Sequence, residues 1–253
     1  NKNNFNIFEN KAVLIIVVIF LIFSTYFILP SFYNKNEIKI LLKDQIFEKY
    51  EIDIKFNEKI GYSLFPKPFF HTKNLEILHK DKIIGNSNYT KFYISPKNFF
   101  SSKKTKIQDL VFKNTDFKIN ANNINFFKKT LYNSENVNEV FFKKSKVFYN
   151  DENDELLFLS KIDILNFFYD EKKELKKLKS NFEIFNVPFK LNISKNIDDY
   201  NKNLTLSSKK IRLNIETSIE HNETKIDGLF DIELLNKSNS FRYLIKNDTL
   251  NFI

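Results

Sequence analysis

The chain holds few residues of the types that catalyse reactions or ligate metals. Its three histidines, His71, His79 and His221, are scattered, and it contains no cysteine. His71 and His79 lack metal-ligand spacing, because ligands on one face of a helix lie three or four residues apart. We interpret all three as isolated surface histidines.

A dense acidic group follows Asn150 and contains Asp151, Glu152, Asp154 and Glu155. Such carboxylates attract Ca²⁺, but the spacing of an EF-hand and its glycine are absent. We therefore interpret this stretch as a solvated hairpin turn. The sequence also lacks a nucleophile elbow, a P-loop and an HExxH motif. We expect no enzymatic activity, no metal and no cofactor.

The formal charge is +9, a balance that in other chains indicates nucleic acid or an anionic membrane surface. Here the lysines are spread along the chain and interleaved with acids, which is typical of a solvated surface. The densest run, residues 170–179, is mixed in sign and predicts an exposed turn and strand edge. No nucleic-acid motif is present, so we expect no nucleic-acid partner.

Residues 12–29 form an apolar run without a charge. As a helix it spans about 27 Å, close to the hydrocarbon thickness of a bilayer. We predict a transmembrane helix over residues 12–33, ended by Pro30. A cleavable signal peptide is the alternative, but its apolar region would be shorter and followed by small residues, whereas FILPSFYNK follows here.

The short tail of residues 1–11 contains Lys2 and Lys11. Because basic residues favour the cytoplasmic side, this tail predicts a cytoplasmic N-terminus, with residues 34–253 outside the cytoplasm. The chain begins with Asn and stops at LNFI, so we expect it to be a fragment whose exported region continues. No linker divides that region, and we assign it as a single β-rich domain.

Residues 36–50 have the spacing of an amphipathic helix, which Asn36 can cap at its start. Its stripe consists of Ile38, Leu41, Leu42, Gln45 and Ile46. From residue 51 onward the apolar period changes to two, which predicts half-buried strands. The alternating sets are Ile52, Ile54 and Phe56; Thr90, Phe92 and Ile94; Phe117 and Ile119; Val147 and Tyr149; Leu191 and Ile193; Leu204 and Leu206; Ile211, Leu213 and Ile215; and Ile226, Gly228, Phe230, Ile232 and Leu234.

Polar turns are expected at residues 150–155, 220–224 and 237–240, joining antiparallel strands as hairpins. With only three glycines in the chain, we expect asparagine to supply the left-handed turn positions. The strands share an Ile, Leu and Phe face that one short helix cannot cover. The sheet therefore either closes as a sandwich or barrel, or curls into an open trough that holds an apolar ligand.

The stretch IGYSLFPKPFF, residues 60–70, concentrates one glycine and two prolines between two strands. Two prolines without N–H donors suit a corner at a sheet edge, and glycine allows a bend that a side chain obstructs. With the preceding helices, this stretch resembles the N-terminal region of the AsmA family of bacterial envelope proteins. The matching corner positions are Gly61, Leu64, Phe65, Pro66 and Pro68.

Residues 92–119, 145–164 and 180–193 resemble the family's following strands in the same order, including the Pro-Phe pair at Pro188 and Phe189. The chain is short for the family. The resemblance implies an inner-membrane protein facing the periplasm, with a role in outer-membrane biogenesis and a long curled β-sheet whose apolar groove binds or transports phospholipid. This implied architecture favours the open trough.

In that case acyl chains lie against the apolar face, and we expect the lipid-facing side chains to be Leu191, Ile193, Ile211, Leu213, Ile215, Phe230, Ile232 and Leu234. Burial of each methylene contributes about 0.8 kcal/mol, so a continuous apolar track can hold a lipid without a specific contact. The alternative function is an anchored β-domain with a closed core that acts as an envelope scaffold or adhesion protein.

Overall fold

The computed structural model describes residues 11–127, 139–196, 202–222, 225–246 and 249–252. Its helical segments are α1 (Lys11–Ile28), η2 (Leu29–Phe32), α2 (Lys35–Tyr50) and η3 (Ser102–Lys104). Its strands are β1 (Asp53–Phe56), β2 (Gly61–Ser63), β3 (Phe69–His79), β4 (Lys82–Ile94), β5 (Ile107–Ile119), β6 (Val140–Asn150), β7 (Leu156–Asp170), β8 (Leu175–Ile184), β9 (Val187–Asn196), β10 (Lys202–Ser208), β11 (Leu213–Asn222), β12 (Lys225–Leu234), β13 (Lys237–Lys246) and β14 (Thr249–Phe252).

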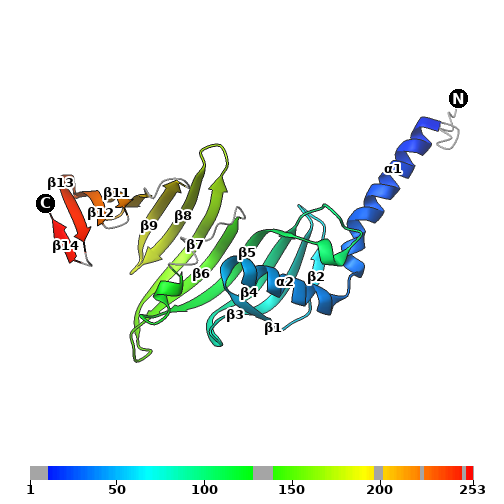
Figure 1. The fold of residues 1–253 in the computed structure, drawn as a ribbon, viewed down its shortest axis with the longest axis horizontal. Coiled ribbons are helices and arrows are strands. Elements are labelled where there is room, and N and C mark those ends of the chain that lie inside the picture. Colours follow the sequence, from blue (N-terminus) through cyan, green and yellow to red (C-terminus); the bar gives the residue numbers. More distant parts are fainter. Residues whose placement is uncertain (1–10, 128–138, 197–201, 223–224, 247–248, 253) are drawn as a thin grey trace.

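All of these strands belong to one open sheet that follows chain order from β1 through β3 to β14, with β2 paired beside β3 (Figure 1). The mainly β prediction is confirmed. The closed sandwich or barrel is wrong, because the two ends of the sheet do not meet. Pairing is antiparallel except between β5 and β6, which run parallel. The connection between them must bring the chain back to the end of the sheet at which β5 begins. It therefore cannot be the tight hairpin expected between antiparallel strands.

Helix α1 projects away from the sheet (Figure 1). The segment Val13–Phe32 is long and apolar enough to cross a membrane, and almost none of it is buried against the rest of the chain. An α-helix occupies Lys11–Ile28, and η2 continues it as a 3₁₀ turn that contains Pro30. The predicted range of 12–33 matches this helical unit closely, while residues 1–10 lie outside the described residues.

Helix α2 covers the N-terminal part of one sheet face. It starts one residue earlier than predicted, and its cap is Asn34 rather than Asn36, since the Asn34 side chain accepts hydrogen bonds from the Asn36 and Glu37 amides. It ends where Glu51 adopts a left-handed conformation. Its buried stripe consists of Ile38, Leu42, Ile46 and Tyr50, whereas Leu41 and Gln45 are half-buried.

Three two-residue hairpin turns contain the pairs Lys80–Asp81, Phe185–Asn186 and Leu235–Asn236, all with positive φ. This is the geometry in which Asn-Gly is usually found, and here Asp or Asn takes the glycine position. The expectation that asparagine replaces glycine is therefore confirmed at Phe185–Asn186 and Leu235–Asn236, whereas aspartate takes this position at Lys80–Asp81. The turn predicted at 237–240 is wrong, because these residues begin β13.

The other predicted turns agree with the structure only in part. Residues 151–155 form the expected turn between β6 and β7. Part of the predicted turn at 220–224 lies outside the described residues. Glu171–Glu174 is an exposed turn, but β8, which follows it, is an inner strand between β7 and β9 rather than an edge.

The predicted corner contains Gly61 in β2 and Leu64, Phe65, Pro66 and Pro68 in the loop that leads to β3. Gly61 does not have a positive φ. A Cβ atom there would lie 2.5 Å from Cε1 of His71, the residue paired with it on β3. Gly61 therefore provides room for the His71 ring instead of a bend.

Candidate functional site: an apolar trough on one face of the sheet

The strand register places mainly apolar side chains in continuous rows across the sheet, because directly opposed residues point to the same face. One row runs from β3 to β13 through Phe70, Phe92, Leu110, Val140, Phe167, Leu178, Ile193, Leu204, Thr217, Phe230 and Phe241. A second row contains Phe112, Phe142, Leu165, Ser180, Leu191, Leu206, Ile215 and Ile232. We call the face that carries these rows the trough.

The N-terminal part of the trough is filled by α2. Leu42 and Ile46 of the helix are no more than 1% exposed, and Phe92 and Leu110 below them are no more than 2% exposed. Gln45 connects the helix to the sheet end, since its Nε2 donates to the Thr105 carbonyl at 2.8 Å and its Oε1 accepts from the Ile107 amide at 2.9 Å. This part of the face is a closed core.

An apolar cavity of about 180 Å³ opens where α2 ends. Tyr50 stands at its helix side, and Phe126 and Phe127 approach from the segment that follows β5. The sheet lines it with Ile77, Ile84, Leu110, Phe112, Phe117, Ile119, Val140, Phe142, Val147, Ile162, Leu165 and Phe167. The apolar surface thus continues beyond the helix.

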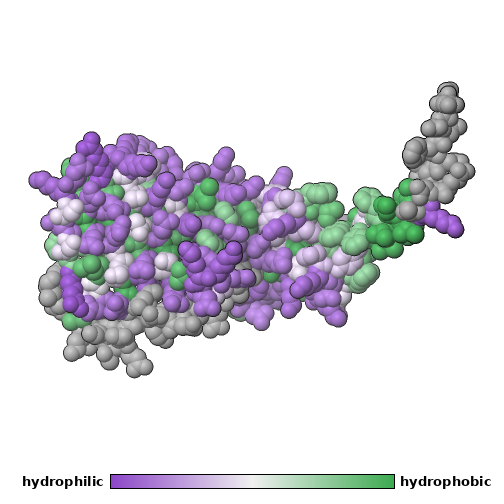
Figure 2. All heavy atoms as spheres, turned by 90° about the horizontal axis from the view of Figure 1, so that it is seen from above, coloured by the Kyte–Doolittle hydropathy of each residue, from purple (hydrophilic) through white to green (hydrophobic). Residues whose placement is uncertain are grey.

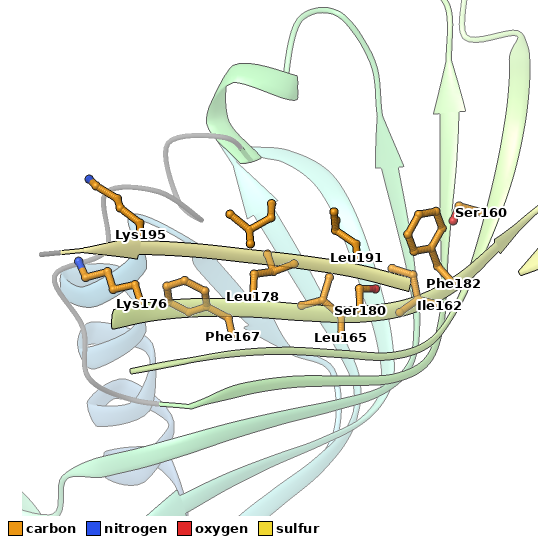
Figure 3. Close-up of a pocket in the computed structure, with 11 residues that line it drawn as sticks. Ser160, Ile162, Leu165, Phe167, Lys176, Leu178, Ser180, Phe182, Leu191 and Lys195 are labelled. Carbon is orange, nitrogen blue, oxygen red and sulfur yellow. The ribbon is translucent and has the colours of Figure 1, made fainter. Parts of the chain in front are cut away.

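A second pocket, of about 240 Å³, lies farther along the same face over β7, β8 and β9 (Figure 3). Its apolar lining residues are Ile162, Leu165, Phe167, Leu178, Phe182, Leu191 and Ile193. Ile162, Leu165 and Phe167 line both cavities. The two cavities are therefore neighbouring parts of one track that begins at the end of α2.

A bulge in β7 brings Ile162 and Leu165 to the same face although they are three residues apart. The register with β8 shifts between Ile162 and Ile164, and an extra residue in a strand reverses the alternation that follows it. Ile164 is consequently exposed while Ile162 is buried. Simple alternation does not find these lining residues, and sequence reasoning missed β7 and β8 as parts of the site.

A set of buried serine and threonine side chains lies on the trough face, between the rows of larger apolar residues. Ser87 accepts hydrogen bonds from the hydroxyls of Thr90 and Thr115, both at 3.0 Å. The Thr115 amide donates to the Ser145 hydroxyl at 3.4 Å. Ser160 and Ser180 continue this buried set under the second pocket. Because Ser160 and Ser180 are short, they leave room for the second pocket above them.

The C-terminal strands carry the predicted lipid-facing residues. Leu191 and Ile193 line the second pocket, and the register carries their rows onward to Ile215, Ile232 and Phe230. Leu213 and Leu234 are paired on the same face. Ile211 is the exception, because it lies in the turn between β10 and β11 and not on a strand.

These C-terminal strands have no covering layer among the described residues: Figure 1 shows α2 near β1–β5 and bare sheet over β8–β13. Leu204, Leu206, Ile215, Phe230 and Ile232 are only half-buried. The trough is thus a filled core at one end and an open apolar surface at the other.

Three lysines border the trough at one end of the strands. Lys176, Lys195 and Lys202 are directly opposed on β8, β9 and β10, and Figure 3 shows Lys176 and Lys195 together at one end of the pocket. Burial and the charge of Lys195 lower the pKa of Lys202. The three lysines place positive charge at this end of the strands, so this basic edge suits an anionic group.

The opposite face of the sheet is mainly polar, apart from an aromatic cluster on β3 and β4 that contains Phe69 and Tyr93. Lys161 and Glu183 form an ion pair at 3.1 Å across β7 and β8, and Lys55 and Glu76 form another at 3.0 Å across β1 and β3. Seen from above the view of Figure 1, the molecule has a largely hydrophilic surface with scattered hydrophobic residues (Figure 2). The sheet is therefore amphipathic, with one face for water and one for apolar groups.

The residues with possible chemistry lie away from one another. His71 packs over Gly61, and His79 stacks on Phe126 with ring centroids 3.8 Å apart. The side chain of His221 lies outside the described residues. Asp151 accepts hydrogen bonds from the Asn153 and Glu155 amides and so stabilises its own turn. Among the described residues, no group of three or more His, Asp or Glu side chains could hold a metal ion.

Comparison of the sequence with protein-family models found no match. A search of curated proteins found no match either. The function of this chain is therefore inferred from the trough, its basic edge and the apolar helix.

Proposed function

We propose that this protein is anchored in the bacterial inner membrane by α1 and that its sheet, on the periplasmic side, binds or transports phospholipid. The carrying observation is the continuity of the apolar trough from the filled core to an uncovered surface. This arrangement is the one that the resemblance to the AsmA family implies, and it makes the protein a candidate for outer-membrane biogenesis.

The dimensions of the trough suit an acyl chain. Six strand spacings separate β6 from β12, and at about 4.8 Å each they cover roughly 29 Å. The hydrocarbon core of a bilayer is about 30 Å thick and contains two layers of chains. An extended acyl chain therefore fits within the trough, with its methylenes against the rows that contain Leu178, Ile193 and Phe230.

Its chemistry suits a lipid as well. Each methylene that leaves water contributes about 0.8 kcal/mol, and no directional contact is needed. A surface of this kind binds an acyl chain but lets it slide from strand to strand, because neighbouring rows of side chains offer similar contacts. The headgroup remains in water at the border, where Lys176 and Lys195 lie.

Photo-crosslinking in cells tests this proposal. A photoreactive amino acid replaces Ile215 or Phe230 on the trough, and Asn192 or Lys190 on the opposite face as matched controls. We expect phospholipid adducts at the two trough positions only. Protein adducts alone at the trough would contradict lipid binding and would favour a scaffold or adhesion role.

A further inference from the structure

Three phenylalanines near α1 are far more exposed than phenylalanine usually is. Phe32, Phe65 and Phe100 are 80%, 82% and 84% exposed, the largest values among the bulky apolar side chains of the described residues. A single exposed apolar residue needs no explanation, but several at one place mark an interaction surface. We call this group the phenylalanine collar.

The three residues of the collar lie on segments next to the C-terminal end of α1. Phe32 ends η2, Phe65 lies in the loop after β2, and Phe100 lies in the loop after β4. The ring of Phe100 is 5.1 Å from that of Tyr26 on the helix. The Tyr62 hydroxyl donates to the Phe27 carbonyl at 2.6 Å, which ties β2 and its loop to the same helix turn.

The two loops are also tied to each other. The Ile94 amide donates to the Pro68 carbonyl at 3.0 Å, joining the end of β4 to the loop that contains Phe65. In Figure 2, hydrophobic surface continues from α1 onto the adjoining end of the sheet. Hydrogen bonds therefore hold the loop of Phe65 both to α1 and to the end of β4, so the position of the collar at the junction is fixed by the fold.

The level of the collar matches the end of the apolar helix. The segment able to cross a membrane ends at Phe32, so the collar lies where the chain leaves the hydrocarbon. Aromatic rings favour this interfacial layer. Lys67 and Lys97 are exposed on the same two loops, and Lys103 is exposed on η3, which follows the second loop. Lys67 lies 3.8 Å from the Asp109 carboxylate, and long basic side chains at this depth extend toward the headgroups.

We propose that the phenylalanine collar inserts into the interfacial layer of the bilayer around α1 and fixes the sheet against the membrane surface. This inference rests on the membrane anchor of the proposed function but not on lipid binding in the trough. The occupant of the surface is the lipid bilayer itself. With the junction seated in this way, the filled part of the trough lies next to the membrane, and its uncovered part lies farther along the sheet, over β8–β13.

The absence of tryptophan from the chain allows a direct test with single-tryptophan variants of the full chain in phosphatidylcholine–phosphatidylglycerol vesicles. Phe65→Trp and Phe100→Trp report on the collar. Phe20→Trp, on α1, reports on the anchor, and Phe185→Trp is the matched control, because Phe185 is 77% exposed on the distant turn between β8 and β9. Lipids with a nitroxide near the headgroup or deep in the acyl chain serve as quenchers.

We expect the shallow quencher to reduce the fluorescence of the two collar variants at least two-fold, the deep quencher to reduce that of Phe20→Trp, and neither to affect Phe185→Trp. Collar variants that behave like Phe185→Trp while Phe20→Trp is quenched would overturn the collar and leave the anchor standing. An unquenched Phe20→Trp would overturn both.

A second readout avoids any dependence on tryptophan at these positions. The chain has no cysteine, so Phe65→Cys and Phe100→Cys carry a single thiol each. We expect a membrane-impermeant maleimide to label them several-fold more slowly in vesicles than in dilute detergent, with Phe185→Cys unchanged. Equal labelling rates in both media would overturn the proposal.

Discussion

The hydroxyl of Tyr26 on α1 accepts a hydrogen bond from the Phe99 amide at 3.1 Å and donates one to the Pro96 carbonyl at 2.6 Å. The rings of Tyr26 and Phe99 also stack, with centroids 5.4 Å apart. Phe99 itself is fully buried. One tyrosine therefore joins the apolar helix to a sheet loop that lies some seventy positions later in the chain, and the helix cannot rotate freely against the sheet.

Replacement of this tyrosine tests the junction. Tyr26→Phe keeps the ring but leaves the Phe99 amide and the Pro96 carbonyl without this partner, so we expect a loss of about 1–3 kcal/mol of unfolding free energy. Denaturant unfolding of the full chain in micelles measures it. Tyr89→Phe, on the polar face of β4, is the control and should change stability by less than about 0.5 kcal/mol. Equal losses in both variants would contradict a structural role for the Tyr26 hydroxyl.

The parts of this fold that were predictable from sequence are those in which periodicity acts locally. The run at residues 12–29 has only one stable form in an apolar environment, and the alternation at Leu191 and Ile193 places both residues on one face. Openness of the sheet was not predictable in this way, because an apolar face looks the same in a sandwich and in a trough. The family resemblance, not the pattern, favoured the correct architecture.

The features that the sequence did not predict correctly have local physical causes. The β7 bulge reverses alternation, so the lining residues Ile162 and Leu165 do not follow the strand period of two. The parallel step from β5 to β6 depends on a connection that carries no strand pattern. Asn34 caps α2 because it lies outside the helix with extended backbone, whereas Asn36, two residues later, is already helical. Ile211 continues an apolar run into a turn.

A methyl group at Gly61 should be costly because of one neighbour. The added carbon in Gly61→Ala meets Cε1 and Nε2 of His71 at 2.5 and 2.6 Å, and overpacking of this kind costs about 1–3 kcal/mol. We expect thermal unfolding to show that loss, and the double variant with His71→Ala to recover most of it. If the loss is the same with and without His71, backbone conformation rather than packing makes glycine necessary.

Acid should weaken the fold before its carboxylates titrate. Burial, with the charges of Lys91 and Lys73, lowers the pKa of His71 below 6.5. The unfolded state therefore takes up a proton first, so the stability that neutral His71 contributes is complete above pH 6.5 and is lost as pH falls through the folded pKa.

Unfolding titrations from pH 7.5 to 5 measure this effect. We expect His71→Gln to flatten the slope in part, because burial also lowers the pKa of His79. Glu76 and Asp170 act at lower pH, since their hydrogen-bonded carboxylates have pKa values below the usual 4.5 and 3.8. A slope unchanged by His71→Gln would assign the acid sensitivity to other groups.

If the trough binds phospholipid as proposed, one charge placed in it should release the lipid. Ile193→Asp puts a carboxylate among the lining residues of the second pocket, and burial of that charge against an acyl chain is strongly unfavourable. We expect at least a ten-fold fall in co-purified phospholipid, measured by mass spectrometry. Asn192→Asp adds the same charge to the opposite face one residue away and should retain the lipid. Lipid retained in both variants would place its binding elsewhere.

Under the same proposal, the basic edge should decide which lipid headgroup the trough prefers. Because Lys176 and Lys195 lie together at one end of the pocket, we expect the double variant Lys176→Gln, Lys195→Gln to lose affinity for phosphatidylglycerol but keep its affinity for phosphatidylcholine. A lysine near an anionic surface contributes about 1 kcal/mol, or roughly five-fold in affinity. The control, Lys179→Gln with Lys190→Gln, removes the same charge from the polar face of β8 and β9. If both pairs of substitutions reduce phosphatidylglycerol binding equally, the preference follows net charge. If only the first pair does, the lysines at the end of the pocket recognise the headgroup, and the apolar rows bind the acyl chain.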